Sequence, residues 1–415
     1  MVRFGTRTSG AAVGLAVLFS LTLAGAPARA EADPPSGQAP DRIVVQLADA
    51  PAPTVLHASP SRIDRTLAAL NQDPAVEYAE RDVLVHAQEV TPNDPLWTQQ
   101  WGPARVRAPR AWVTTTGSAT VRIAVLDSGV DAGHEDLAGA VVAGWNVLAG
   151  NANTADDNGH GTAAAAVIAA RGNNARGVAG VCWSCAIMPV KVLGANGGGY
   201  MSDLAAGIRW AVDNGASVVN MSVAGASSTK SLEAAITYAV EREVVLVGSA
   251  GNDATTTMAY PAANPDVVGV AASSRTDQPD DYTNRGSWVD VAAPGCNLAA
   301  VAAVEGGGYR TFCGTSSAAP VVAGALGLAR VKAPSASVAQ LRSALTATAV
   351  PVGSWVRHGR IDAAGTVEAL TPAPSPSPSP SPSPSPSPAD RLSGGGDGEG
   401  EGDGDGEGDG EGEGD

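Results

Sequence analysis

The sequence predicts an α/β fold in which a mostly parallel sheet is covered by helices on both faces. Between about residues 91 and 370, short apolar segments alternate with longer segments that have a helical pattern. The short segments are near-continuous runs of Val, Ile and Ala, which is typical of parallel strands buried on both faces. In such sheets, binding and catalytic residues gather at the carboxyl ends of the strands.

The expected elements alternate along this region. The expected strands cover residues 121–127, 186–193, 216–222, 244–251, 266–272 and 288–295. The expected helices cover residues 161–171, 201–215, 228–243, 316–331 and 337–348. The helix expected at 316–331 carries Pro320 in its first turn, where proline is tolerated.

Residues 31–90 are expected to form a small unit of their own. Residues 42–47 have a strand pattern, 61–73 a helix pattern and 75–87 a further strand pattern. The resulting α+β segment is too small to suggest an enzyme. The larger domain is expected at residues 91–370.

The first thirty residues have the features of a secretory signal peptide. Arg3 and Arg7 precede an apolar stretch, and Ala28-Arg29-Ala30 forms a small-x-small cleavage site. The apolar part is shorter than the roughly 20 residues that a membrane-spanning helix needs. We therefore expect a secreted, extracellular protein whose mature chain has no transmembrane segment.

The acidic character of the chain lies mainly in its C-terminal tail. The formal net charge is −16, and ten acidic residues lie between Asp397 and Asp415, which leaves about −6 (−16 + 10) for the rest. The rest has no basic face, so no nucleic-acid partner is expected. We expect residues 371–389 to be an extended Ser-Pro linker and residues 390–415 a disordered Gly-acidic tail. Weak calcium or cell-wall association of that tail is the alternative.

Four cysteines agree with export. Cys182 and Cys185 form a Cys-Trp-Ser-Cys segment, and Cys296 and Cys313 form a more widely separated pair. A redox motif, half of a zinc site and two structural disulfides are the alternatives. Zinc would need a second close pair or nearby histidines, and the sequence has neither. An oxidising compartment favours disulfides from Cys182 to Cys185 and from Cys296 to Cys313.

Four polar residues have settings that suit catalysis. Asp127 ends an apolar strand, and His160 lies between glycines just before an Ala-rich helix. Asn252 follows a buried strand, and Ser316 begins a helical run of small residues. Taken singly, each has a structural explanation, such as a turn for Asp127 and Asn252 or a helix cap for Ser316.

The joint occurrence of these motifs changes their interpretation. An Asp-Ser-Gly turn, a Gly-His-Gly-Thr helix entry, an Ala-Gly-Asn turn and a Gly-Thr-Ser-x-Ala-x-Pro helix entry occur in this order. Asp, His, Ser is the order of the subtilisin triad. The chain therefore resembles the subtilases, or subtilisin-like serine proteases, and within them the thermitase-like branch. The likeness covers residues 91–370 and includes the segments TPNDP, HEDLAG, NNARGVAG and GSWVDVAAPG.

The resemblance implies a serine endopeptidase that acts on polypeptides without a catalytic cofactor. Ser316 would attack the peptide carbonyl, His160 would take its proton, and Asp127 would orient the imidazole. The Asn252 side chain and the Ser316 backbone N–H would hold the oxyanion. A subtilase-shaped surface or binding protein that has lost turnover is the alternative. A different α/β hydrolase would need a Gly-x-Ser-x-Gly elbow, which is missing here.

The resemblance also implies where a substrate lies. An extended peptide would pair with the segment Ser222, Val223, Ala224 and Gly225. Ala224 stands where the family usually has glycine, which is expected to narrow the pocket for the residue before the cut. Ala259 would form the base of that pocket, and no carboxylate accompanies it, so apolar or small residues are expected there.

Other positions depart from the family without touching the triad. Ala163 stands where the family often has histidine, and Ala319 and Val321 stand where serine and histidine are frequent. These departures leave the expected reaction in place and bear on rate and specificity.

A structural calcium site is also implied by the resemblance. Asp94, Asp136 and Asn174 match the side-chain ligands of the family's strong site, and the loop 171–178 could add backbone carbonyls. A charged loop without metal is the alternative. A second, thermitase-type site is expected to be impaired because only Asp156 and Asp157 are retained.

The unit at 31–90 resembles the family's inhibitory propeptide, most clearly in the segment LNQDPAVEYAERD. As an intramolecular inhibitor it would assist folding, occupy the cleft with residues 82–87, and then be cut away between Ala87 and Asp94. A permanently attached regulatory domain is the alternative. The mature enzyme is expected to be a monomer.

Overall fold

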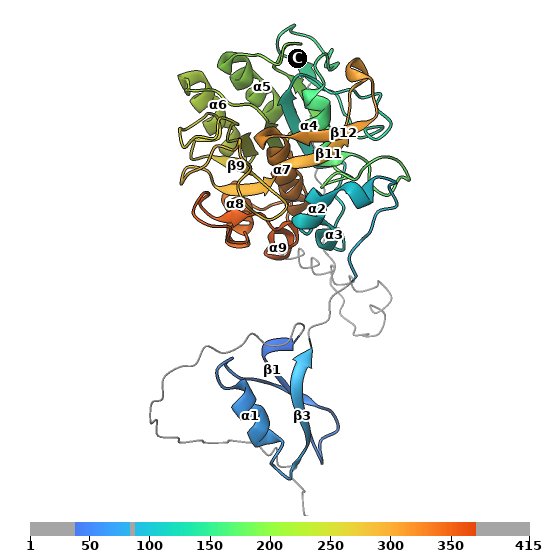
Figure 1. Ribbon diagram of the computed structural model, residues 1–415, viewed down its shortest axis with the longest axis vertical. Coiled ribbons are helices and arrows are strands. Elements are labelled where there is room, and N and C mark those ends of the chain that lie inside the picture. Colours follow the sequence, from blue (N-terminus) through green and yellow to red (C-terminus); the bar gives the residue numbers. More distant parts are fainter. Residues whose placement is uncertain (1–37, 84–87, 371–415) are drawn as a thin grey trace, which may run out of the picture. The chain divides into compact units, whose positions relative to one another are not determined.

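Figure 1 shows the computed structural model of the chain, which describes residues 38–83 and 88–370. The expected signal peptide, Ser-Pro linker and Gly-acidic tail lie outside the described residues. The chain divides into two compact units, with the division between Thr91 and Pro92. Each unit has a core of its own. In the described part of the chain, no helix combines the length and the apolar character needed to cross a membrane.

The first unit is a small antiparallel sheet with one helix. Its elements are β1 (Gln38–Leu47), β2 (Thr54–His57), α1 (Ile63–Leu70) and β3 (Val76–Val83). The strands are ordered β2-β1-β3, and α1 packs on the sheet through a core of Ile43, Val45, Ile63 and Ala79. Strand β2 was missing from the sequence prediction. The expected strand at 75–87 is described as far as Val83, and residues 84–87 lie outside the described residues.

The second unit is built on an eight-stranded sheet whose neighbouring strands are all parallel. Its order is β13-β10-β9-β8-β7-β4-β6-β5. The strands are β4 (Arg122–Asp127), β5 (Trp145–Asn146), β6 (Ala186–Lys191), β7 (Val218–Met221), β8 (Val245–Ser249), β9 (Val267–Ser273), β10 (Val291–Pro294) and β13 (Gly359–Arg360). The predicted fold class is confirmed. Because the strands are parallel, the residues that follow β4, β7 and β8 meet at one edge of the sheet.

Helices cover both faces of this sheet (Figure 1). The main ones are α4 (His160–Ala169), α5 (Met201–Asp213), α6 (Lys230–Val240), α7 (Thr315–Lys332) and α8 (Val338–Ala347). Helices α5 and α6 share a buried apolar cluster with β4, β6, β7 and β8. Helix α7 packs against β7, β8, β9 and β10, and also against α4. Shorter helices complete the unit: η1 (Trp97–Gln99), α2 (Trp101–Arg105), α3 (Ala108–Ala111), η2 (Ala303–Glu305) and α9 (Ala363–Glu368).

A separate antiparallel hairpin leads into α7. Strands β11 (Cys296–Ala300) and β12 (Tyr309–Cys313) pair with Cys296 opposite Cys313. The sequence analysis did not predict this hairpin. It matters for the site because β12 ends one residue before the N-cap of α7, Gly314.

The position of Pro320 differs from the prediction. Helix α7 begins at Thr315 and extends beyond Pro320 by more than two turns, so Pro320 lies inside the helix and not in its first turn. Proline has no N–H, so it cannot bond to the carbonyl four residues earlier, which belongs to Ser316. In this helix that carbonyl accepts a hydrogen bond from the Ser222 hydroxyl, at 3.0 Å. The proline therefore frees an acceptor that ties α7 to the segment after β7.

Candidate active site

The candidate site begins with a carboxylate and an imidazole at the carboxyl end of β4. Asp127 is the last residue of that strand and is fully buried. His160 is the first residue of α4, and its Nδ1 lies 2.8 Å from Asp127 Oδ1 and 2.9 Å from Asp127 Oδ2. An ionised carboxylate can only accept, so Nδ1 carries the proton and Nε2 is left as an acceptor.

Small residues allow the two elements to approach each other this closely. A Cβ added at Gly161 would lie 2.1 Å from the Gly129 carbonyl oxygen and 3.0 Å from Asp127 Cβ. Asp127 ends β4 and Gly129 belongs to the turn that follows, so a side chain at Gly161 would push α4 away from the end of this strand. The Gly-His-Gly pattern in the sequence thus reflects close backbone packing, and it places His160 against Asp127.

The surroundings of His160 act on its pKa in opposite directions. Burial of the ring disfavours the charged form, but the charge of Asp127 and its hydrogen bond to Nδ1 more than offset this and raise the pKa of His160. The charge of Asp156 acts in the same direction as Asp127, whereas Arg310 opposes it. An imidazole with a raised pKa is a stronger proton acceptor when it is neutral.

Ser316 lies at the start of α7 and is joined to the segment after β7. Its Oγ donates to the Ser222 carbonyl oxygen at 3.2 Å, and the Ser222 hydroxyl donates back to the Ser316 carbonyl. The N-cap of α7 is Gly314 and makes no side-chain cap, so Ser316 is not the cap that its position in the sequence suggested. Ser317 is fully buried, and its hydroxyl accepts a hydrogen bond from Asn297 at 2.9 Å, so its role is packing.

Asn252 is oriented by the residue that precedes Ser316. Asn252 Oδ1 accepts hydrogen bonds from the Thr315 backbone N–H at 2.9 Å and from the Thr315 hydroxyl at 3.0 Å. The Thr315 hydroxyl in turn accepts from Gly251 N–H at 3.1 Å. With its oxygen held in this way, the amide has its NH₂ group free to donate at the start of α7. Sequence reasoning missed Thr315.

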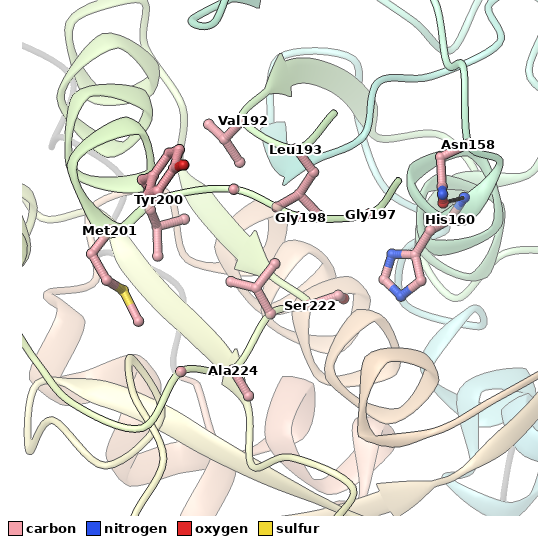
Figure 2. Close-up of a pocket in the computed structure, with 14 residues that line it drawn as sticks. Asn158, His160, Val192, Leu193, Gly197, Gly198, Tyr200, Met201, Ser222 and Ala224 are labelled. Atoms are coloured by element: carbon pink, nitrogen blue, oxygen red, sulfur yellow. Dashed lines mark hydrogen bonds between the residues drawn. The ribbon is translucent and has the colours of Figure 1, made fainter. Parts of the chain in front are cut away.

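A cleft of about 400 Å³ extends from His160 along the segment Ser222–Gly225 (Figure 2). Figure 2 shows the His160 ring at one end, Tyr200 and Met201 at the other, and Ser222 between them. The full lining is Asn158, His160, Val192, Leu193, Gly197, Gly198, Gly199, Tyr200, Met201, Leu204, Ser222, Val223, Ala224 and Gly225. The cleft therefore has apolar walls and a length of exposed backbone.

The predicted pocket residue Ala259 lies beside this segment. Gly225 and Tyr260 exchange two backbone hydrogen bonds of 2.8 Å, and Ala259 is the buried neighbour of Tyr260. Ala259 does not line the cleft of Figure 2. The structure thus brings Ser222, Val223, Ala224 and Gly225 together on one wall, and Ala259 is not part of the lining of this cleft.

The hairpin β11–β12 adds an aromatic contact that the sequence did not reveal. Phe312 meets the His160 ring edge to face, with ring centroids 5.2 Å apart. Phe312 is buried, and it is followed by Cys313 and by the Gly314 turn that leads to Ser316. The aromatic ring therefore closes one side of the imidazole.

The cysteines are paired as the sequence analysis favoured. Cys296 and Cys313 form a cross-strand disulfide between β11 and β12. Cys313 lies three residues before Ser316. Cys182 and Cys185 form the second disulfide and are both fully buried. Because it is buried, the Cys-Trp-Ser-Cys segment is not exposed to redox partners, so a structural role fits it better than a reactive one.

The three predicted calcium ligands lie together. Asn174 Nδ2 donates to Asp136 Oδ1 at 2.8 Å, and the backbone N–H of Asn173 donates to Asp94 Oδ2 at 2.6 Å. Asp94 and Asp136 are both buried, and burial together with the nearby charge of Asp94 raises the pKa of Asp136. Asp94 Oδ1 is buried without any hydrogen-bond partner. An orphaned carboxylate oxygen beside a second buried carboxylate suits a hard cation such as calcium.

No cluster of three or more His, Cys, Asp or Glu side chains is available for a metal in the described ranges 38–83 and 88–370. Two carboxylates with amide and carbonyl oxygens therefore remain the relevant donor set. That set suits calcium and does not suit zinc or a redox metal.

The second acidic pair has different partners. Asp156 accepts hydrogen bonds from the hydroxyls of Ser128 and Thr162 and from three backbone N–H groups, at Asn158, Gly159 and Thr162. Asp157 pairs with the ammonium of Lys191, with Nζ 2.6 Å from Oδ1. Lys191 was not predicted, and no local pattern marks it, because it occupies an ordinary position at the end of β6.

Comparisons with known proteins point to one protein family. The model of the Subtilase family matches residues 118–381. A thermophilic serine proteinase of Bacillus sp. (strain AK1) is 37% identical over 309 residues, which cover 74% of this chain and 76% of that protein. Thermitase of Thermoactinomyces vulgaris is 37% identical over 282 residues, which cover 67% of this chain and 99% of thermitase.

A solved structure of similar fold also matches this chain. A structure of proteases from Pseudoalteromonas arctica PAMC 21717 matches with a TM-score of 0.62 and 32% sequence identity. The match covers 68% of this chain and 99% of that one. At this identity and coverage, the shared fold extends over the whole of that structure.

Proposed function

Because the chain belongs to the subtilase family of serine proteases, we propose that it is a secreted endopeptidase that hydrolyses peptide bonds with Asp127, His160 and Ser316. The observation that supports this most directly is the carboxylate–imidazole pair: a buried Asp127 holds Nδ1 of His160 and leaves Nε2 free. His160 and Ser222 line one cleft, and Ser316 is hydrogen-bonded to Ser222.

The proposed reaction follows from these positions. The Ser316 hydroxyl turns from the Ser222 carbonyl to His160 Nε2 and gives up its proton as Oγ attacks the substrate carbonyl carbon. The imidazolium that forms is stabilised by Asp127, and it then protonates the leaving amine. Water repeats the sequence on the acyl-enzyme and releases the second product.

The oxyanion is assigned to two donors near the start of α7. One is the Ser316 backbone N–H, which lies in the first turn of the helix and so has no partner within α7. The other is the Asn252 side-chain amide, whose oxygen is held by Thr315. Preorganised donors of this kind typically contribute about 10²- to 10³-fold to turnover.

The substrate is assigned to the cleft wall at Ser222–Gly225. An extended peptide gains backbone hydrogen bonds there, which makes few demands on sequence. The apolar lining that includes Val192, Leu193 and Met201 favours apolar side chains before the cut. Ala224 adds a methyl group on this wall, so small residues are favoured next to the cleaved bond.

A structural calcium ion is proposed for Asp94, Asp136 and Asn174. The partnerless Asp94 Oδ1 and the raised pKa of Asp136 are the observations that support it. A bound cation would neutralise the two carboxylates and tie the loop 171–178 to the segment that contains Asp94. It takes no part in the reaction.

The first unit is proposed to be an inhibitory propeptide that is removed by the enzyme itself. Its α+β fold of one helix on a three-stranded sheet agrees with that assignment. The cut is placed between Ala87 and Asp94, after the strand that ends this unit. The mature enzyme is proposed to act outside the cell as a monomer.

One experiment tests the proposal and its non-enzymatic alternative. The Ser316→Ala variant should remain an uncut precursor without casein hydrolysis, while Ser317→Ala should process itself and cleave casein. A sulfonyl fluoride should label the wild-type peptide that contains Ser316. Undiminished cleavage by purified Ser316→Ala protein, or label on Ser317, would overturn the assignment. An inactive but folded wild-type protein would favour the binding-protein alternative.

A further inference from the structure

Three chain segments meet at the hydroxyl of Tyr282, next to the turn that carries Ser316. The Tyr282 hydroxyl donates to Asp280 Oδ2 at 2.9 Å and lies 3.2 Å from the Gly295 carbonyl oxygen. The backbone N–H of Gly314 donates to the same hydroxyl at 3.3 Å, and to the Gly295 carbonyl at 2.9 Å. Gly314 is the N-cap of α7, two residues before Ser316.

The packing around this hydroxyl leaves no spare room. A Cβ added at Gly295 would lie 2.1 Å from Asp280 Oδ2 and 2.7 Å from Tyr282 Oη. The carboxylate and the hydroxyl thus lie directly against the backbone between β10 and β11. Their positions are therefore fixed by the chain that leads to the nucleophile turn.

The single proton of the hydroxyl has a defined direction. An ionised Asp280 can only accept, so the Tyr282 proton lies toward it, and the oxygen lone pairs remain for the Gly314 N–H. Hydrogen bonds in such a chain strengthen one another. Burial, followed by the hydrogen bond to Asp280, raises the pKa of Tyr282, so the hydroxyl keeps its proton at neutral pH.

We propose that Tyr282, held by Asp280, is a positioning residue for the nucleophile. Its hydroxyl fixes the Gly314 amide, and through the short Gly314 turn it sets where Ser316 Oγ and the Ser316 N–H point. Tyr282 does not touch the reacting atoms. The inference rests on the proposed function, since it concerns the same nucleophile.

The Tyr282 hydroxyl is not the only contact that holds the Gly314 turn in place. The Cys296–Cys313 disulfide already ties β11 to β12, and the Gly314 N–H keeps its bond to Gly295. Removing the hydroxyl should therefore change the geometry of the turn more than the stability of the protein. This difference separates a positioning role from a merely structural one.

The test begins with Tyr282→Phe, which keeps the ring and removes the hydroxyl. We expect kcat on a soluble peptide substrate to fall about three- to tenfold, which corresponds to one hydrogen bond, with KM within about twofold of wild type. The matched control is Tyr238→Phe on α6, since Tyr238 also donates to an aspartate, Asp213, at 2.5 Å. That control should keep both constants. Active-site titration with a sulfonyl fluoride corrects each kcat for the fraction of active enzyme.

A double-mutant cycle tests the part played by Asp280. Asp280→Asn alone should lower kcat, but it should have no further effect in the Tyr282→Phe background, because Asp280 acts through the hydroxyl. An unchanged kcat in Tyr282→Phe, a loss equal to that of Tyr238→Phe, or additive effects of the two substitutions would overturn the proposal. An inactive wild-type protein would instead contradict the proposed function, so the two failures are distinguishable.

Discussion

Two carboxylates of this chain, Asp136 and Asp156, behave in opposite ways. The pKa of Asp136 is raised, chiefly by burial, whereas the pKa of Asp156 is lowered even though burial acts on it in the same direction. The difference lies in their partners. Asp156 accepts from five donors. Asp136 accepts from Asn174 on one oxygen and from Val178 on the other, and a hydrogen bond with Tyr309 acts in the same direction. The nearby negative charge of Asp94 adds to the effect of burial.

The comparison shows that acidic residues alone do not define a cation site. Asp156 is satisfied by the protein, and its neighbour Asp157 is paired with the Lys191 ammonium. Asp94 and Asp136 instead leave one buried oxygen without a partner. A carboxylate that already has enough donors gains little from calcium, while one that lacks them gains much. The impairment of the second site remains a prediction from the sequence.

The largest expected effect comes from exchanging each carboxylate for an amide. Asp156→Asn should lower the free energy of unfolding by about 3–5 kcal/mol, because several buried donors lose an acceptor. Asp136→Asn, measured with a chelator present, should change it by less than about 1 kcal/mol, since the amide removes an uncompensated charge. Urea unfolding of both variants in a Ser316→Ala background, which prevents self-digestion, gives the two values. If both variants lost the same free energy of unfolding, the number of hydrogen-bond donors around each carboxylate would not explain the difference between them.

Calcium removal should have the next largest effect. If calcium is present at about 100 times its Kd, chelation should lower the free energy of unfolding by about 2.7 kcal/mol. Asp136→Asn should abolish this difference, whereas Asp157→Asn, at the second acidic pair, should leave it intact. A calcium effect that survives Asp136→Asn would place the ion elsewhere. The readout is the urea midpoint with calcium and with chelator.

The fold was predictable because its signals are local. Residues 244–247, for example, form an unbroken run of Val and Leu, which directly indicates a parallel strand buried on both faces. The settings of Asp127 and His160 were also readable, since a strand end and two glycines are visible in the sequence. The parallel topology places the end of β4 at the edge of the sheet where such sites form, and the glycines around His160 allow α4 to begin against it.

The supporting residues were not predictable, because they act across the chain. Phe312, Lys191 and Tyr282 occupy ordinary strand or loop positions. Each has at least one partner that lies far away in the sequence, namely His160, Asp157 and Gly314, respectively. The predicted start of α7, residue 316, lies within one residue of the observed start at Thr315, but Pro320 is the sixth residue of the helix and therefore lies in its second turn. Local patterns report which faces are buried, but they do not report which polar atoms meet there.

Lys191 offers a smaller test of the second acidic pair. Its ammonium donates to the Ser128 carbonyl at 2.5 Å, to Asp157 at 2.6 Å and to the Leu193 carbonyl at 3.1 Å. Lys191→Met should cost about 1–2 kcal/mol, because two carbonyls lose a donor. Asp157→Asn should cost less than about 1 kcal/mol, because that side chain is 50% exposed. If Asp157→Asn costs more than Lys191→Met, the ion pair and not the carbonyl bonds holds the turn.

The smallest expected effect is the pH dependence of the first acidic pair without calcium. The folded pKa of Asp136 lies above its ordinary value of 3.8, so the folded state binds this proton more tightly than the unfolded state. Its contribution to stability is fully present below about pH 3.8 and is lost as the pH rises through the folded pKa. Asp156 has a lowered pKa, so its contribution is present above its ordinary value and is lost only as the pH falls through its folded pKa.

In chelator, the stability of the Asp136→Asn variant relative to its parent should therefore decrease as the pH falls from 7 toward 4. Unfolding free energies of the two proteins at several pH values in this window give the difference directly. With saturating calcium the trend should reverse, because the ion favours the ionised carboxylate and acid then expels it. If the stability of Asp136→Asn relative to its parent instead increased on acidification in chelator, the hydrogen bonds to Asp136 would outweigh burial, and its pKa would be lowered like that of Asp156.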